Sequence, residues 1–246
     1  MKKTLILFTC ILALTAMASC ASIPTGTTAD NDTASPTNSF DPDTAYAAIL
    51  TESFELLSAS SDSAEYTDEM FGIFEAAMTF GADAANTVGY VFRDVNADTI
   101  PELLIGVFDK HSDAHTKNEI YAAYTHDGNN PVLLFSGWAR NSYALTDENT
   151  FYYYGSGGAA NSIFGEYALS ETGQFVCKNV YFTNPKEPEM TEIGYYHSAA
   201  GTTDPMQAEE WTASADEFWA VETALAAKTT ALTATPFSAY TAANPT

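Results

Sequence analysis

The feature that most constrains the fold is a succession of short apolar stretches between residues 88 and 198, each bounded by turn-forming residues. In the stretch at 88–92, apolar side chains alternate with others, which is the period of a strand that buries one face. Short polar turns join successive stretches, with DGNN at 127–130, DEN at 147–149 and SETG at 170–173. Turns of this length connect antiparallel neighbours. The sequence therefore predicts an antiparallel meander with strands at 88–92, 102–108, 119–126, 131–137, 141–146, 150–155, 162–169, 174–182 and 192–198.

Helical patterns flank this region on both sides. The dipeptide Asp41-Pro42 is a helix start, because Asp can cap free N–H groups and Pro fits the first helical position. A second helix is expected to begin after Thr67. Near the C-terminus, Ser214 and Glu217 have the spacing of a capping box. The predicted fold class is therefore α+β, an antiparallel β-sheet meander flanked by N-terminal and C-terminal helices.

The first 20 residues have the pattern of a secretory signal. Lys2 and Lys3 precede an apolar run of 14 residues, whereas a helix that crosses a bilayer core needs about 20. The segment ends in Met-Ala-Ser-Cys, which resembles a bacterial lipobox with Met17 where Leu is usual. That resemblance implies that Cys20 carries acyl chains such as palmitate and becomes the mature N-terminus. Cleavage of the Ala-x-Ala type, with release of the protein, is the alternative.

The chain is expected to have four parts. Residues 1–20 are the signal peptide, and residues 21–40 form a flexible tether with too little apolar surface to offset the entropy of ordering. Residues 41–230 form a single α+β domain, and residues 231–246 form a C-terminal tail. Because more than one acyl chain gives stable anchoring, the expected location is the extracytoplasmic face of a bacterial cell envelope.

The charge and the cysteines limit the partners. Loss of Lys2 and Lys3 with the signal leaves seven basic residues against 32 acidic ones, a net charge of −25. Nucleic acid and anionic lipid headgroups bind to basic surfaces, so neither is an expected partner of this acidic chain. Contact with the membrane is expected through the lipid anchor. After Cys10 leaves with the signal and Cys20 is acylated, Cys177 is the one cysteine left, so no intrachain disulfide is expected.

The stretch RDVNADTIPELLIG, at residues 93–106, has the spacing of a cation-binding loop. Hard cations such as calcium take carboxylate, amide and backbone carbonyl oxygens that converge from alternate positions of a tight turn. Positions one, three, five, seven and nine of the loop are Asp94, Asn96, Asp98, Ile100 (through its carbonyl) and Glu102. An EF-hand would have Glu at position twelve, where this chain has Ile105, and helices rather than strands on both sides.

This loop resembles the calcium hairpins of FG-GAP and VCBS-type repeats, in which D-x-[DN]-x-D-G-x-x-[DE] is common. With the following segments, EIYAAYTHDGNNPVLLFSG and RNSYALTDENTFYYYGSGGA, it also resembles a group of uncharacterised bacterial lipoproteins. The similarity spans residues 42–228 and implies a fold and a location, since that group has no settled activity. It implies calcium as the cofactor of the loop.

One position departs from the repeat pattern. Gly is usual at position six, where the turn needs a positive φ, and this chain has Thr99 there. A β-branched residue is costly in that conformation. Either the turn takes another path, or the loop no longer holds an ion and is an ordinary Asx-rich turn.

Two other patterns are less specific indications of a functional site. Asp109, His111, Asp113 and His115 alternate, as metal ligands on a strand would, although a solvated loop explains them as well. The aromatic residues Trp138, Tyr152, Tyr153 and Tyr154 can stack on a sugar or peptide where they are exposed, or simply pack in the sheet.

No recognisable catalytic arrangement is present in the sequence. The expected function is therefore a membrane-anchored module that binds an unknown protein or carbohydrate ligand, with a calcium-stabilised acidic hairpin. The alternatives are a cell-envelope hydrolase that uses carboxylates and the aromatic surface, and a purely structural envelope protein. The sequence leaves the presence of any catalysis open.

Overall fold

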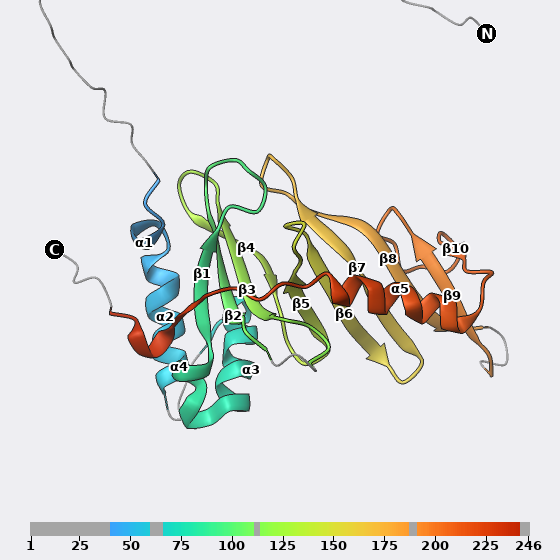
Figure 1. Cartoon of the computed structure of the whole chain (residues 1–246), viewed down its shortest axis with the longest axis horizontal. Coiled ribbons are helices and arrows are strands. Elements are labelled where there is room, and N and C mark those ends of the chain that lie inside the picture. The colour runs from blue at the N-terminus through green and yellow to red at the C-terminus, as the bar shows by residue number, and fades with distance from the viewer. Residues whose placement is uncertain (1–39, 60–65, 111–113, 187–190, 242–246) are drawn as a thin grey trace, which may run out of the picture. The chain divides into compact units, whose positions relative to one another are not determined.

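A computed structural model describes residues 40–59, 66–110, 114–186 and 191–241, which form a large antiparallel sheet with helices packed against it (Figure 1). The predicted α+β class is confirmed. The predicted signal, Cys20 and residues 21–39 of the predicted tether lie outside the described residues, and so do His111 and Asp113. Phe40, the last residue of the predicted tether, belongs to the domain instead, because its ring packs edge-on against Tyr46. Residues 39–246 belong to one compact unit of the chain.

The sheet is built largely from neighbours in sequence. Its order is β10-β9-β8-β7-β6-β5-β3-β2-β1-β11, and β4 also pairs with β3. The strands are β1 (Gly89–Arg93), β2 (Glu102–Val107), β3 (Glu119–His126), β4 (Pro131–Ser136), β5 (Asn141–Leu145), β6 (Phe151–Gly158), β7 (Asn161–Leu169), β8 (Phe175–Pro185), β9 (Ile193–Ser198), β10 (Glu209–Glu210) and β11 (Thr235–Pro236).

The three predicted hairpins are confirmed by the pairing. In them β3 pairs with β4, β5 with β6, and β7 with β8, all antiparallel. Two strands pair with the same edge of β3. Strand β4 pairs with its C-terminal half, and Tyr143 of β5 pairs with Ile120 near its N-terminal end. The Gly-rich segment after Tyr154 continues β6 to Gly158, so the turn to β7 is made by Ala159 and Ala160. The stretch at 192–198 is not the last strand, since β10 and β11 follow it.

The helices lie where the start signals predicted them. The helices are α1 (Pro42–Ala45), α2 (Ala47–Ser58), α3 (Phe71–Phe80), α4 (Ala84–Thr87) and α5 (Ala215–Ala227), with short 3-10 turns η1 (Asp68–Met70), η2 (Gly81–Asp83) and η3 (Phe237–Ala239). The expected first helix is interrupted at Tyr46, whose hydroxyl donates to the carbonyl of Pro101 at 3.0 Å. The capping box of α5 is present: the Ser214 hydroxyl accepts from the Glu217 N–H, and the Glu217 carboxylate accepts from the Ser214 N–H.

Apolar side chains are buried on both sides of the sheet. On β2, Leu103 and Ile105 pack with α2, α3 and α4, while Leu104 packs in a cluster on the opposite side. On β6, Phe151 belongs to that second cluster, and Tyr152 packs under α5. Because successive strand residues point to opposite faces, these memberships follow directly from the strand register.

Helix α3 packs directly on the backbone of the sheet. A Cβ atom at Gly72 would lie 2.2 Å from the carbonyl oxygen of Tyr121, so only glycine permits this approach. The Gly72 N–H also donates to the hydroxyl of Ser136, at 3.0 Å. The N-terminal helices are thereby fixed to β3 and β4.

Residues 231–241 belong to the domain and are not a separate tail. After α5 the chain runs across the sheet to β1 and pairs with it as β11 (Figure 1). Phe237 is fully buried in the cluster under the N-terminal helices. The predicted boundary at residue 230 is therefore too early, because a single buried Phe in a polar stretch has no periodic pattern. The C-terminal segment closes the same core that the N-terminal helices begin.

Replacement of Phe237 by Ala should therefore destabilise the whole domain. Truncating a buried Phe costs about 3–5 kcal/mol, since it removes apolar contact and leaves a cavity. Urea unfolding followed by tryptophan fluorescence measures this loss. Met206→Ala is the control, because Met206 is 91 % exposed and should leave the free energy of unfolding unchanged. Equal midpoints for both variants would show that the segment is a dispensable tail.

Candidate functional site

The acidic loop joins β1 to β2 and is organised by its own side chains. The Asp94 carboxylate accepts from the Thr99 N–H at 3.1 Å, and the Asp98 carboxylate accepts from the Ile100 N–H at 2.8 Å. The side-chain oxygen of Asn96 accepts from the Asp98 N–H at 3.3 Å. These bonds hold the side chains of positions one, three and five on the inside of the turn, which is the arrangement that a cation would need.

The backbone resolves the question raised by Thr99. Its φ is +74°, so Thr99 occupies the left-handed conformation expected of glycine at position six. Ala97 also has a positive φ, +61°. Such conformations cost about 1–3 kcal/mol each at non-glycine residues and persist only where the surroundings enforce them. Thr99 therefore adopts the positive φ that the repeat pattern requires at position six, although it is not glycine.

One carboxylate oxygen in the loop lacks a partner. Asp94 Oδ1 is buried and makes no hydrogen bond with any described residue. A buried, unsatisfied carboxylate oxygen is unfavourable, since burial removes water and supplies nothing in exchange. Its other oxygen, Oδ2, is held by Thr99, so the orientation of the carboxylate is fixed.

Glu102 connects the acidic loop to strand β3 through its carboxylate. It is fully buried, its Oε2 accepts from the Val95 N–H at 3.0 Å, and its Oε1 accepts from the Thr125 hydroxyl at 3.0 Å. Desolvation raises the pKa of Glu102 to about 7, with the nearby Asp98 adding to the increase and the two hydrogen bonds opposing it. Glu102, expected as a ligand, thus also clamps the loop to β3.

The loop is also tied to the rest of the sheet. The Asn96 amide donates to Asp98 and to the carbonyl of Ser170 in the β7–β8 turn, each at 2.9 Å. Arg93 donates to the side chain of Asn149 in the β5–β6 turn. Three connections that are far apart in sequence therefore meet around the acidic loop.

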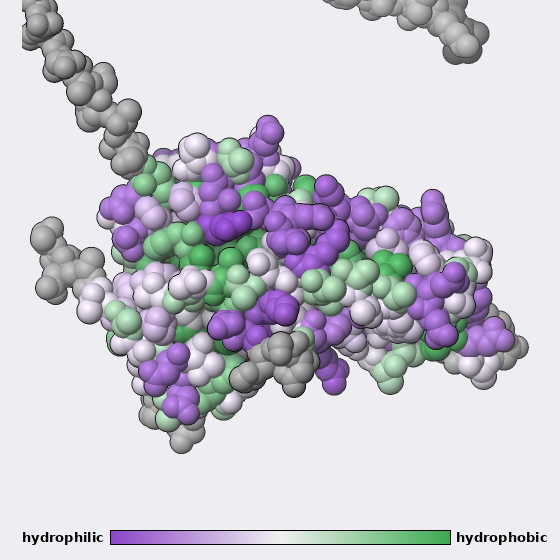
Figure 2. Space-filling model, in the orientation of Figure 1, coloured by the Kyte–Doolittle hydropathy of each residue, from purple (hydrophilic) through white to green (hydrophobic). Residues whose placement is uncertain are grey.

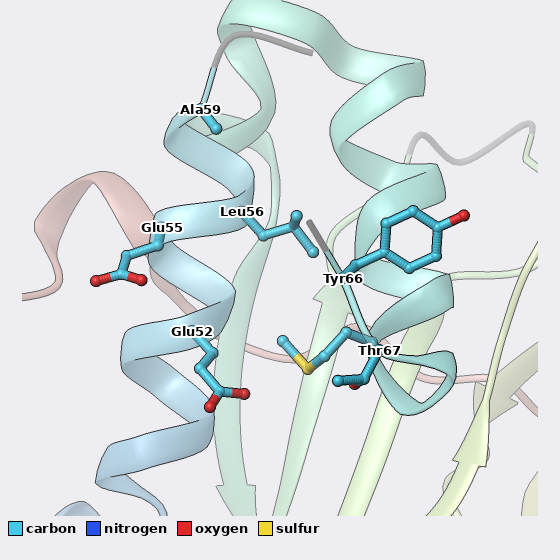
Figure 3. A pocket seen from close by; sticks show the side chains of 7 residues that line it. Glu52, Glu55, Leu56, Ala59, Tyr66 and Thr67 are labelled. Carbon is cyan, nitrogen blue, oxygen red and sulfur yellow. The ribbon is translucent and has the colours of Figure 1, made fainter. Parts of the chain in front are cut away.

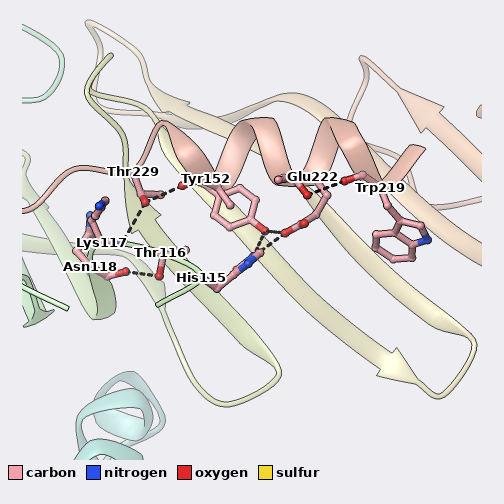
Figure 4. Close-up of polar contacts among 10 residues, drawn as sticks. His115, Thr116, Lys117, Asn118, Tyr152, Trp219, Glu222 and Thr229 are labelled. Carbon is pink, nitrogen blue, oxygen red and sulfur yellow. Dashed lines mark hydrogen bonds and ion pairs between the residues drawn. The ribbon is translucent and has the colours of Figure 1, made fainter. Parts of the chain in front are cut away.

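A second polar site lies near the other end of β2. Helix α5 places Glu222 against the sheet, where its Oε1 accepts from the Tyr152 hydroxyl and lies 2.6 Å from His115 Nε2 (Figure 4). His115 Nε2 is also 3.1 Å from the Tyr152 hydroxyl. The side chain of Glu222 is 9 % exposed and that of His115 is 56 % exposed. Burial raises the pKa of Tyr152, and the bond to Glu222 adds to the effect, so the phenol stays protonated as a donor.

His115 and Tyr152 border a small cleft of about 180 Å³, and Glu222 contacts both residues without lining the cleft itself. Its lining includes Lys110 and Glu119, which form an ion pair at 3.0 Å, together with Thr116, Ser142 and Tyr154. The ring of Tyr154 is at 6.0 Å from that of His115, at a steep interplanar angle of 65°. The cleft therefore combines hydroxyls, one ion pair, an imidazole and an aromatic ring.

The structure divides the predicted aromatic set. Tyr152 and Tyr154 face the cleft, and Tyr153 lies on the opposite side of β6, in contact with Tyr143 and Tyr167. Trp138 is 41 % exposed and packs edge-on against Phe71 of α3. The four residues are thus not one surface, because alternation along β6 separates neighbours.

Glu222 was not predicted as a site residue, and His115 had no predicted partner on α5. Glu222 lies in a helix with two other acidic residues, Asp216 and Glu217, and nothing in its spacing indicates that it points inward. Only the docking of α5 on β6 brings it to His115, 107 positions away in the chain. Cys177 is partly buried, and burial raises the pKa of its thiol.

A groove of about 460 Å³ lies between α2 and residues 66–70, with Leu56, Tyr66 and Met70 in its lining (Figure 3). The described residues that line it form no hydrogen-bonded polar cluster. The face seen in Figure 2 is mainly hydrophilic, with apolar patches between the polar side chains. This agrees with the acidic composition.

Comparison with known proteins gives no match: no family model, no curated protein and no solved structure is similar enough to this chain. Among the described residues, no helix has the length and apolar character needed to cross a membrane. Within those same residues, no three His, Cys, Asp or Glu side chains form a metal-holding group. The loop would have to hold a cation with amide and backbone oxygens as well.

The buried Glu102 predicts a pH-dependent stability. Its pKa is raised from an ordinary value of 4.5 to about 7, so the folded protein holds this proton more tightly than the unfolded chain. The stabilisation is complete below pH 4.5 and is lost as the pH rises through 7. In calcium-free buffer, the free energy of unfolding should therefore fall over this range, and Glu102→Gln should flatten the fall.

Urea unfolding at a series of pH values measures the effect. Glu171→Gln is the matched control, because Glu171 is exposed in the β7–β8 turn and should keep the wild-type profile. An unchanged slope in the Glu102→Gln variant would assign the pH dependence to other groups.

Proposed function

We propose that this protein is a lipid-anchored lipoprotein domain on the extracytoplasmic face of a bacterial cell envelope, and that it binds a ligand there. We further propose that a calcium ion stabilises the acidic hairpin. The anchoring part is supported by the signal pattern and by Cys20 in a lipobox-like segment. The net charge of −25 supports a partner other than nucleic acid.

The observation that carries the calcium proposal is the unpartnered Asp94 Oδ1. It is a buried anionic oxygen at position one of a loop whose positions three and five also present oxygens inward. A divalent cation would satisfy it, together with Asn96, Asp98 and the carbonyl of Ile100. Glu102 would join the shell through a free lone pair while still clamping Val95.

Thr99 supports the same proposal. A left-handed Thr is an energetic cost that an ordinary surface turn could avoid by a different path. The loop keeps the path instead, and binding energy from an ion would offset the cost. The bound ion would also lower the effective negative charge around Glu102 and favour its ionised form.

Calcium should raise the stability of the wild-type domain and not that of Asp94→Asn. At a calcium concentration 100 times the dissociation constant, the expected gain is about 2.7 kcal/mol. Thermal unfolding with and without calcium, and isothermal titration, measure the gain and the affinity. Asp127→Asn in the β3–β4 turn is the control, since that carboxylate only accepts turn N–H groups.

Thr99→Gly extends the experiment in the other direction. Glycine adopts the required φ without strain, so this variant should be more stable than the wild type both with and without calcium, and it should keep the calcium-dependent gain. If wild type, Asp94→Asn and Thr99→Gly all show no calcium-dependent stabilisation, the calcium part of the proposal is rejected.

Anchoring is tested separately by Cys20→Ser. Expressed with its signal in a bacterium that processes lipoproteins, the wild type should incorporate labelled palmitate and sediment with membranes. Cys20→Ser should lose both, whereas Cys177→Ser should keep both, because Cys177 lies in β8 of the folded domain. Membrane sedimentation and palmitate labelling of the Cys20→Ser variant at the wild-type level would reject lipidation at Cys20.

A cell-envelope hydrolase is the second candidate function. The specific observation in its favour is the hydrogen-bonded group of Glu222, Tyr152 and His115, which brings a carboxylate, a phenol and an imidazole to one cleft. A base oriented by a carboxylate is a recurrent element of hydrolytic sites. Turnover of a bound ligand, lost on His115→Ala, would distinguish this function from binding alone.

A further inference from the structure

The cleft beside His115 has a fixed hydrogen-bonding pattern. Glu222 Oε1 is an acceptor when ionised, and it lies 2.6 Å from His115 Nε2. The short distance requires a hydrogen between them, so the imidazole carries its proton on Nε2. In the neutral ring, Nδ1 is then a bare acceptor, and no described residue donates to it. His115 Nδ1 is therefore a hydrogen-bond acceptor available to a ligand, and the buried carboxylate of Glu222 sets the orientation of its ring.

The buried part of the site preorganises this acceptor. Tyr152 is 2 % exposed and donates to the same Glu222 oxygen, so the carboxylate cannot turn without losing both bonds. Helix α5 fixes Glu222 in turn, because its neighbour Phe218 is fully buried against β7 at Phe164. A carboxylate held from two elements fixes the His115 ring at the rim of the cleft.

The remaining lining is polar but carries no net charge of its own. Lys110 and Glu119 are of opposite sign and pair at 3.0 Å. Thr116 donates to the carbonyl of Asn118, which leaves its oxygen free to accept. Such a mixture of donors and acceptors suits a neutral ligand with several hydroxyl groups better than an anion or a cation, whose charge would be left unpaired.

Size and the aromatic wall narrow the class of ligand. At about 180 Å³ the cleft is smaller than the usual pocket for drug-sized molecules, which begins at about 300 Å³. Tyr154 is 36 % exposed and offers a ring beside His115, where an apolar face of the ligand can pack. A single sugar ring has both the hydroxyl edge and the apolar C–H face that these groups match.

We propose that this cleft binds one neutral sugar ring, with His115 Nδ1 accepting a hydroxyl hydrogen and Tyr154 packing on the ring face. The inference rests on the proposed binding function and names the ligand class for it. Glu222 acts as a positioning residue, since it reaches the ligand only through His115.

Ligand-observed saturation-transfer NMR tests this proposal on the folded domain (residues 39–246). The probes are neutral monosaccharides (glucose, galactose and N-acetylglucosamine), with glucuronate and glucosamine as charged counterparts. At least one neutral sugar should bind at millimolar affinity and more tightly than either charged one. His115→Ala and Tyr154→Ala should each weaken binding about tenfold or more.

Tyr153→Ala is the matched control for Tyr154→Ala. Both remove a Tyr from β6, but Tyr153 lies on the other side of the strand and should leave binding unchanged. Circular dichroism establishes that each variant is folded before it is compared. Equal binding by Tyr154→Ala and the wild type would place the ligand elsewhere and overturn the proposal.

Glu222→Leu tests the positioning role, because it removes the acceptor while keeping a side chain of similar size, and the tautomer of His115 is a readout that packing alone does not change. The ¹⁵N shifts of the His115 ring should report the Nε2–H tautomer in the wild type and a loss of that preference in Glu222→Leu, with weaker sugar binding. Unchanged shifts would overturn the positioning role.

The failures of the two proposals are distinguishable. A domain that binds calcium as expected but binds none of the neutral sugars overturns this inference alone. A domain that binds a sugar through His115 and Tyr154 but takes up no calcium overturns only the calcium-stabilised hairpin.

Discussion

The clamp made by Glu102 is the interaction on which the acidic loop depends. A buried carboxylate is costly unless its oxygens are hydrogen-bonded, and Glu102 meets that requirement only if Val95 and Thr125 stay in place. The loop, the start of β2 and the middle of β3 are therefore locked as one piece. This closed path holds Thr99 in its left-handed conformation and keeps Asp94 turned inward.

The same strand connects the two candidate sites. Strand β2 begins at Glu102, and the chain that follows it carries Lys110 and His115 into the cleft. Each site buries one carboxylate under polar donors, Glu102 in one and Glu222 in the other. The two sites differ in the groups that surround the buried carboxylate. Oxygen atoms of the loop surround Glu102, and such a set suits a hard cation. An imidazole and an aromatic ring lie beside Glu222, and these groups suit a molecule with hydroxyl groups. The two proposals thus concern separate chemistry and can stand or fall separately.

Local patterns predicted most of the fold. The turn sequences at 127–130, 147–149 and 170–173 define hairpins whose strands pair as expected, since short turns leave no other partner within reach. The capping box at Ser214 marks the start of α5. The loop pattern predicted a positive φ at position six, whereas the β-branched Thr99 opposes it, so only the structure could show which of the two prevails. Phe237 was also missed, since its burial comes from the return of the chain to β1 rather than from any pattern around it.

The α+β class and the succession of hairpins follow from local sequence alone, and so do the predictions of a cation loop and a lipid anchor. These depend on residues close together in the chain, where spacing is enough to fix geometry. The packing of distant segments sets which aromatic residues share a surface, which carboxylates are buried and which side chains contact His115. Tyr152 and Tyr153 are neighbours in sequence but lie on opposite faces, whereas His115 and Glu222 are distant in sequence and in contact. Contacts of that kind arise when α5 docks on the sheet, and no local spacing encodes them.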